Sequence, residues 1–183
     1  NSYAGPKAET PKFMQDSLET AQAMAAAGKT SEEIRAVTGW FPGKYDGKMR
    51  WEVPDDGARL TQKWRSAKTV GEAINHSALF QAYPELKDVS LDVFFDQNGN
   101  DSGHILTFGG VNPATGKPDE DAASVIEVQA TSDALGLSTL LHEIQHWVQN
   151  KEGFAKGSNP TAESSKAGRA KNVTDAQYKL GKA

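Results

Sequence analysis

The 183-residue sequence contains no cysteine. Disulfide frameworks, thiolate zinc sites and cysteine nucleophiles are therefore excluded. No apolar run approaches the ~20 residues that a transmembrane helix needs, so we expect no membrane span. The chain also lacks a methionine at its first position, Asn1, and shows no signal peptide. We expect a chain that is processed or cut from a longer polypeptide.

The sequence has no excess of basic residues, since its net charge is −4. A nucleic-acid partner is not expected, because phosphate binding needs clustered Lys and Arg. From Lys151 on, basic residues outnumber acidic ones, which we interpret first as a solvated tail and only second as a weak contact for a polyanion. The hydrophobic share of 37% and the charged share of 24% are typical of a soluble globular domain. We predict one main domain over residues 30–160, an N-terminal arm and helix over 1–29, and a polar C-terminal tail over 161–183.

Periodicity and capping signals predict an α+β fold with a small mixed sheet. We expect a mobile arm at residues 1–11 and a turn-rich loop at 40–47. Capping boxes begin at Thr30 and at Thr69. The predicted helices cover residues 12–27, 30–38, 69–83 and 133–150, and the predicted strands cover residues 48–53, 89–95, 105–108 and 125–128.

The last predicted helix carries the motif His-Glu-x-x-His as His142, Glu143 and His146. Residues four apart on a helix project in nearly the same direction, so both imidazoles can reach one metal ion. Zinc accepts nitrogen ligands and, in catalytic sites, leaves one position for water. Glu143 then lies where it can take a proton from that water. The motif predicts a Zn²⁺ site with His142 and His146 as ligands and Glu143 as the catalytic residue.

The rest of this helix supports that prediction. On a wheel of ~100° per residue, its large apolar side chains fall opposite the histidines. These apolar residues are Leu137, Leu140, Leu141, Ile144, Trp147 and Val148. The helix would be held in the core by one face and would line a cleft with the other. Two alternatives are ordinary surface histidines and a purely structural zinc site, which would leave Glu143 without a purpose.

The third metal ligand has three candidates. Glu152 lies ten residues after His142, at a spacing used by some zincins after a Gly-made turn, but the turn position here is Gln149. If the helix continued, Glu152 would point away from the histidines. Glu163, in a later segment, is the second candidate. The third is a residue beyond Ala183.

The other chemically notable residues have simpler interpretations. We expect His76 to lie at a surface or cap a helix, and His104 to be a half-exposed strand residue. The cluster Asp96, Asn98, Asn100 and Asp101 lacks the downstream bidentate Glu of a calcium loop. We interpret it as a turn between two strands.

Three stretches together resemble a domain of the large polyvalent proteins encoded by phages and other mobile elements. They are residues 38–52, with Thr-Gly-Trp-Phe and Asp-Gly-Lys-Met-Arg-Trp-Glu; residues 76–88, around Leu-Phe-Gln-Ala-Tyr-Pro-Glu-Leu; and residues 138–157, which contain the His-Glu-x-x-His motif. The resemblance covers about residues 30–160. It implies a metallopeptidase-like domain within a phage or plasmid polypeptide that works in the bacterial host cytoplasm or is packaged in a virion and delivered with DNA. The further helix typical of the family has no clear match before Ala183.

The sequence therefore predicts a zincin-like zinc metallohydrolase, most simply a peptidase with a protein or peptide substrate. Glu143 would act as general base and pass its proton to the leaving amine. An edge strand, from residues 89–95 or 125–128, would pair with an extended substrate. The alternative is a non-catalytic structural or packaged component with a degenerate or incomplete metal site.

Overall fold

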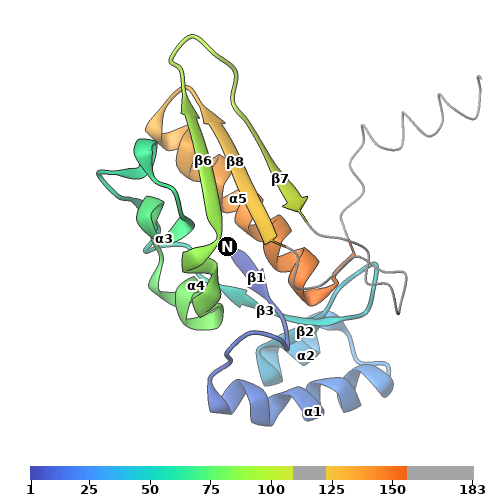
Figure 1. Cartoon of the computed structure of the whole chain (residues 1–183). Helices are drawn as coiled ribbons and strands as arrows, with labels where there is room; N and C mark the ends of the chain where they lie inside the picture. Colours follow the sequence, from blue (N-terminus) through green and yellow to red (C-terminus); the bar gives the residue numbers. More distant parts are fainter. Residues whose placement is uncertain (109–122, 156–183) are drawn as a thin grey trace, which may run out of the picture.

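The computed structural model describes residues 1–108 and 123–155. Sheets within these residues are small (Figure 1). The first has the order β1-β3-β2 and is antiparallel, with β1 at Ser2–Ala4, β2 at Trp40–Pro42 and β3 at Met49–Val53. The second pairs β4 (Arg59–Leu60) with β5 (Ile74–Asn75). The third has the order β6-β8-β7, with β6 at Ser90–Phe95, β7 at Ser102–Phe108 and β8 at Ala123–Ala130.

The third sheet is mixed, because β6 is parallel to β8 while β7 is antiparallel to it. Helix α5 (Asp133–Glu152) follows β8 directly and covers one face of this sheet, as Figure 1 shows. The prediction of an α+β fold with a small mixed sheet is thus confirmed.

The two N-terminal helices form close to where the sequence predicts them. Helix α1 covers Lys12–Ala26, and Gly28 follows with φ 77°. Helix α2 covers Ser31–Thr38, with the capping box of Thr30 and Glu33 fully formed and Gly39 in the left-handed region. A small core lies between these helices and the first sheet, built on Met14, Ala21, Ile34, Trp40 and Met49.

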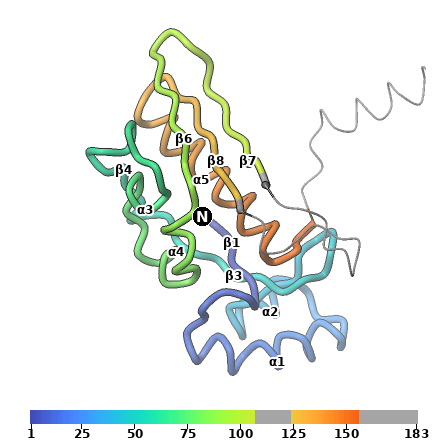
Figure 2. Tube along the Cα trace, viewed as in Figure 1, coloured from blue at the N-terminus to red at the C-terminus, as the bar shows by residue number. Residues whose placement is uncertain are grey.

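The predicted mobile arm is wrong. Residues 2–4 form β1, which pairs with β3, and Ser2 and Ala4 are buried. The Cα trace runs from β1, beside α5, down into α1 (Figure 2). Small residues suit this narrow path: a Cβ on Gly5 would lie 2.6 Å from the side chains of Glu152 and Phe154. Small residues in this segment thus permit close packing against the end of α5.

The predicted helix over residues 69–83 is also wrong in its middle. It divides into α3 (Val70–Ala73), strand β5 and α4 (Ser77–Ala82). β5 pairs with β4, a distant partner that local periodicity cannot reveal. Two 3₁₀ helices, at Trp64–Ser66 and Pro84–Asp88, flank this region. The loop predicted at 40–47 likewise begins with strand β2.

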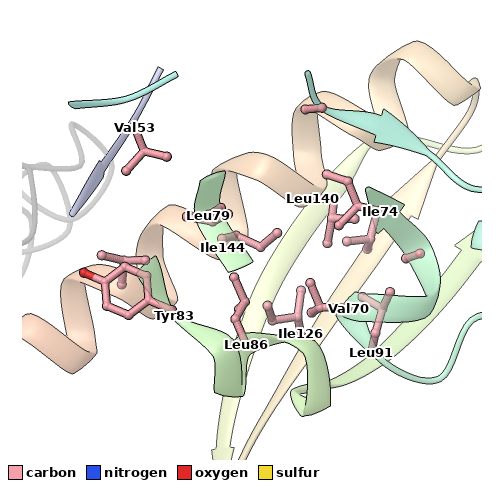
Figure 3. Close-up of a cluster of buried hydrophobic side chains, with 14 of the residues drawn as sticks. Val53, Val70, Ile74, Leu79, Tyr83, Leu86, Leu91, Ile126, Leu140 and Ile144 are labelled. Atoms are coloured by element: carbon pink, nitrogen blue, oxygen red, sulfur yellow. The ribbon is translucent and has the colours of Figure 1, made fainter. Parts of the chain in front are cut away.

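The main core lies between α5, the third sheet and the short helices (Figure 3). Leu140, Ile144 and Val148 of α5 are fully buried there, together with Leu91 and Ile126 from the sheet. This is the apolar face that the helical wheel predicts. At ~25 cal/mol per Å² of apolar surface, each such side chain stabilises the fold by ~1.5–3 kcal/mol.

The residues between β6 and β7 form a turn, as predicted. The Asp96 carboxylate accepts a hydrogen bond from the Asn98 backbone at 3.0 Å, and Asp101 accepts one from the Thr131 backbone at 2.8 Å. No helix in the described residues is long and apolar enough to cross a membrane. The predicted tail over 161–183 lies outside the described residues.

Candidate metal centre

Helix α5 positions the motif by running without interruption from Asp133 to Glu152. The Ser132 side chain accepts a hydrogen bond from the Leu135 backbone and begins the helix, and Gly153, with φ 67°, ends it. Its regular pitch puts His142 and His146 one above the other. The buried apolar face of the helix fixes the direction in which they point.

The two imidazoles converge on one point. The Nε2 atoms of His142 and His146 are 3.0 Å apart, and the ring centroids are 4.5 Å apart with an interplanar angle of 85°. The Glu143 carboxylate joins them: one ligand atom from each of the three residues lies within 4.8 Å of the others. Among the described residues this is the only group of three or more His, Asp or Glu side chains that is so close.

The donor set fits a zinc ion. Metal–nitrogen distances of ~2.0–2.1 Å in a tetrahedral arrangement would put the two nitrogens ~3.4 Å apart. The observed separation of 3.0 Å needs to open by only a few tenths of an ångström. His142 is exposed and His146 is half-buried, so the pair is accessible from solvent.

Glu143 lies beneath the edge of the third sheet. Its side chain is buried, with 4% exposure, and it faces Gly103 of β7. A Cβ at Gly103 would lie 2.7 Å from the Glu143 Cγ and 2.7 Å from the Thr139 Cγ2, so only glycine leaves room for the carboxylate. No described residue donates a hydrogen bond to this carboxylate. Its oxygens keep their lone pairs for a proton or a bound water.

Gln149 is a site residue that the sequence suggested only as a departure from glycine. Its Oε1 lies 2.9 Å from the Nδ1 of His146. The signal was present, because Gln149 is three residues after His146 and residues at this spacing are neighbours on a helix. Gly103 gave no such signal, since its contact depends on how β7 packs against α5.

Glu152 does not join the histidines. Because α5 continues to this residue, the side chain points about a quarter to a third of a turn away from the histidines, and it is buried, with 6% exposure. The Tyr83 hydroxyl donates to its Oε1 at 2.7 Å, and the Lys7 backbone donates to both oxygens at 3.1 Å. Burial, and then the hydrogen bond to Glu152, raise the pKa of Tyr83 above its usual range. The expectation that Glu152 is the third ligand is therefore corrected: Glu152 joins the end of α5 to the N-terminal segment at Lys7 and to Tyr83 after α4.

The other two candidates for the third ligand are not described: Glu163 lies in the undescribed part of the chain, and residues beyond Ala183 lie outside it. The remaining two histidines lie elsewhere. His76 caps α4 and accepts a hydrogen bond from the Leu79 backbone at 3.3 Å. This agrees with the expectation that His76 caps a helix. It is buried, with its Nε2 2.8 Å from the Asp55 carboxylate. The exposed His104 pairs across the sheet with Glu127 at 2.6 Å.

The strand beside the site is β7. Residues 125–128 belong to β8, which is central in its sheet and pairs on both sides, so they cannot receive a substrate strand. Residues 89–95 form the opposite edge as β6. β7 is the edge that contacts α5, and it has no strand partner on its outer side within the described residues.

Comparison with known proteins finds one family. Residues 1–61, one third of the 183-residue chain, match the model for large polyvalent protein associated domain 23. The match supports the expected association with large polyvalent proteins. It overlaps the expected resemblance only over residues 30–61, and the His-Glu-x-x-His helix lies outside it. No curated protein and no solved structure matches the chain.

Proposed function

We propose that this protein is a zinc-dependent metallohydrolase of zincin type that cleaves peptide bonds. The observation that carries the proposal is the convergence of the His142 and His146 Nε2 atoms at 3.0 Å with the Glu143 carboxylate beside them. Two nitrogen ligands, and a buried carboxylate that has no hydrogen-bond partner among the described residues, are the parts that zinc-assisted hydrolysis needs.

Each residue then has one task. A zinc ion held by His142 and His146 would supply the positive charge that polarises a scissile carbonyl and acidifies a water molecule. Glu143 takes the proton from the attacking water and delivers it to the departing amine nitrogen. Its burial under β7 keeps the carboxylate at one side of the histidine pair, so that proton transfer occurs in a fixed direction.

The edge of β7 favours a peptide as substrate. An extended peptide that added to this edge would form backbone hydrogen bonds along Ser102–Phe108. Gly103 faces Glu143 on the α5 side of β7, so a peptide along the neighbouring edge would lie beside the proposed base. A strand-like substrate bound there would present successive carbonyl groups to the site.

The first test measures zinc per chain by elemental analysis after purification in metal-replete buffer. We expect about one zinc in wild type and in Glu143→Gln, and none in His146→Ala. On a quenched-fluorescent peptide library, Glu143→Gln should lose activity by ~10²–10⁴-fold, while Glu19→Gln, an exposed carboxylate on α1, should match wild type. Equal activity of wild type and Glu143→Gln, both carrying zinc, would rule out the mechanism.

A second candidate function is a non-catalytic component of a large polyvalent protein with an incomplete metal site. It is favoured by the number of metal ligands. Among the described residues, only Glu143, the proposed base, joins the two histidines, and no further residue supplies a third protein ligand. The Glu143→Gln variant distinguishes the two candidate functions. A non-catalytic component loses nothing measurable in that variant, whereas an enzyme keeps its metal and loses turnover.

A further inference from the structure

Gln149 contacts His146 at the ring nitrogen that does not face His142. Its Oε1 lies 2.9 Å from the Nδ1 of His146, on the side of the ring away from His142. Gln149 is half-buried one turn further along α5, and within the described residues its side chain has no other hydrogen-bond partner. A neutral imidazole has one N–H and one lone pair, and the partner of one nitrogen decides the state of the other.

We propose that Gln149 is a positioning residue that holds His146 in its Nδ1–H tautomer with the Nε2 lone pair directed at the metal. The inference rests on the proposed zinc site and deepens it. An amide oxygen only accepts, so a contact between Oε1 and Nδ1 requires the proton to be on Nδ1. The same contact fixes the ring against rotation about its χ2 angle.

The contact between the two histidines assigns the second tautomer. With its proton on Nδ1, His146 can only accept at Nε2. The 3.0 Å contact between the two Nε2 atoms then requires the proton of the metal-free pair to be on the His142 side. The two histidines are therefore unequal before metal binding. His146 is already prepared as a ligand, and His142 must move its proton from Nε2 to Nδ1.

This inequality follows from burial. His142 is exposed, so water can accept its relocated Nδ1 proton, whereas His146 is half-buried and depends on Gln149. Without the amide, His146 would lose the partner that selects its tautomer and orients its ring. Partners of this kind typically change metal affinity by ~10–100-fold.

The test combines imidazole nitrogen NMR of the metal-free full chain at alkaline pH with zinc affinity by chelator competition. In wild type we expect His146 as the Nδ1–H tautomer and His142 as the Nε2–H tautomer, and both as Nδ1–H once zinc is added. Gln149→Ala should give His146 as a tautomer mixture and bind zinc ~10–100-fold more weakly. Gln149→Glu, which still accepts at the same place, should restore both readouts.

Asn150→Ala is the matched control, because Asn150 is the next residue on α5 and is exposed. It should leave tautomers and affinity unchanged. An Nε2–H tautomer for His146 in metal-free wild type would overturn the inference, and so would wild-type zinc affinity in Gln149→Ala. If wild type binds no zinc, the proposed metal site fails, while the tautomers of the metal-free chain still decide the role of Gln149.

Discussion

At the scale of single residues, Gly103 sets the position of the proposed base. A Cβ there would meet the Glu143 and Thr139 side chains at 2.7 Å, well inside van der Waals contact. We expect Gly103→Ala to push the carboxylate away from the histidines while leaving both ligands in place. A misplacement of ~1 Å can cost ~10²-fold in rate. The variant should therefore keep its zinc and lose most of its peptidase activity, measured on a substrate found with wild type.

Gly57→Ala is the control for this substitution, because a Cβ at Gly57 would meet nothing within 4 Å. Wild-type turnover in Gly103→Ala would show that Glu143 does not depend on β7 for its position. A variant that loses zinc as well would instead show that β7 supports the whole site.

Some residues of the candidate site can be identified from the sequence, and others cannot. His142, Glu143 and His146 are identified by spacing alone, because a helix brings residues four apart together whatever else the chain does. The roles of Gly103 and Glu152 were not accessible in that way. Gly103 acts across a strand-to-helix contact, and Glu152 acts through Tyr83 and Lys7, which are distant in the sequence.

At the scale of elements, the C-terminal end of α5 is held by the N-terminal segment through Glu152. Glu152→Ala would leave the buried Tyr83 hydroxyl and the Lys7 backbone N–H without this acceptor. A lost buried partner costs ~1–3 kcal/mol. We expect a lower midpoint in urea unfolding and an unchanged zinc content, with Glu19→Ala on the exposed side of α1 as control. Zinc loss without loss of stability would restore Glu152 as a ligand.

Long elements with strong local signals were the ones predicted correctly. Helix α5 and strands β6 and β8 appear within a few residues of their predicted bounds. The short strands β1, β4 and β5 were missed, because each has two or three residues and exists only through a partner far along the chain. Pairing of this kind overrides local propensity, which is why the helix predicted over 69–83 is divided by β5.

At the scale of the whole molecule, the segment matched by the family model, residues 1–61, and helix α5 pack into one structure. Ala4, Val53 and Ala58 belong to the same buried core as Leu140 and Ile144. The domain boundaries expected at residues 29 and 160 stay predictions, and so does the expected location in a bacterial host or virion. A match over residues 1–61 therefore describes a segment that packs against the helix carrying the site, although the motif lies outside it.

Asp46 joins these two parts of the molecule and makes their contact dependent on pH. Its carboxylate accepts from the Ala155 backbone at 2.6 Å and from the Arg50 guanidinium at 2.7 Å, and Arg50 in turn lies over the Phe154 ring. Burial raises the pKa of Asp46, but the hydrogen bonds from the Ala155 and Lys48 backbones and the charge of Arg50 lower it more, so the pKa lies below its ordinary value of 3.8. A lowered folded pKa means that the stabilisation is complete above the unfolded value of ~3.9 and is lost as the pH falls through the folded value.

We expect Asp46→Asn to be less stable than wild type by ~1–3 kcal/mol at pH ~7, with the two urea midpoints approaching each other below pH ~4. Asp16→Asn, an exposed i,i+4 partner of Lys12, should parallel wild type throughout. Parallel curves for Asp46→Asn as well would mean that the N-terminal third is held against the end of α5 without this carboxylate.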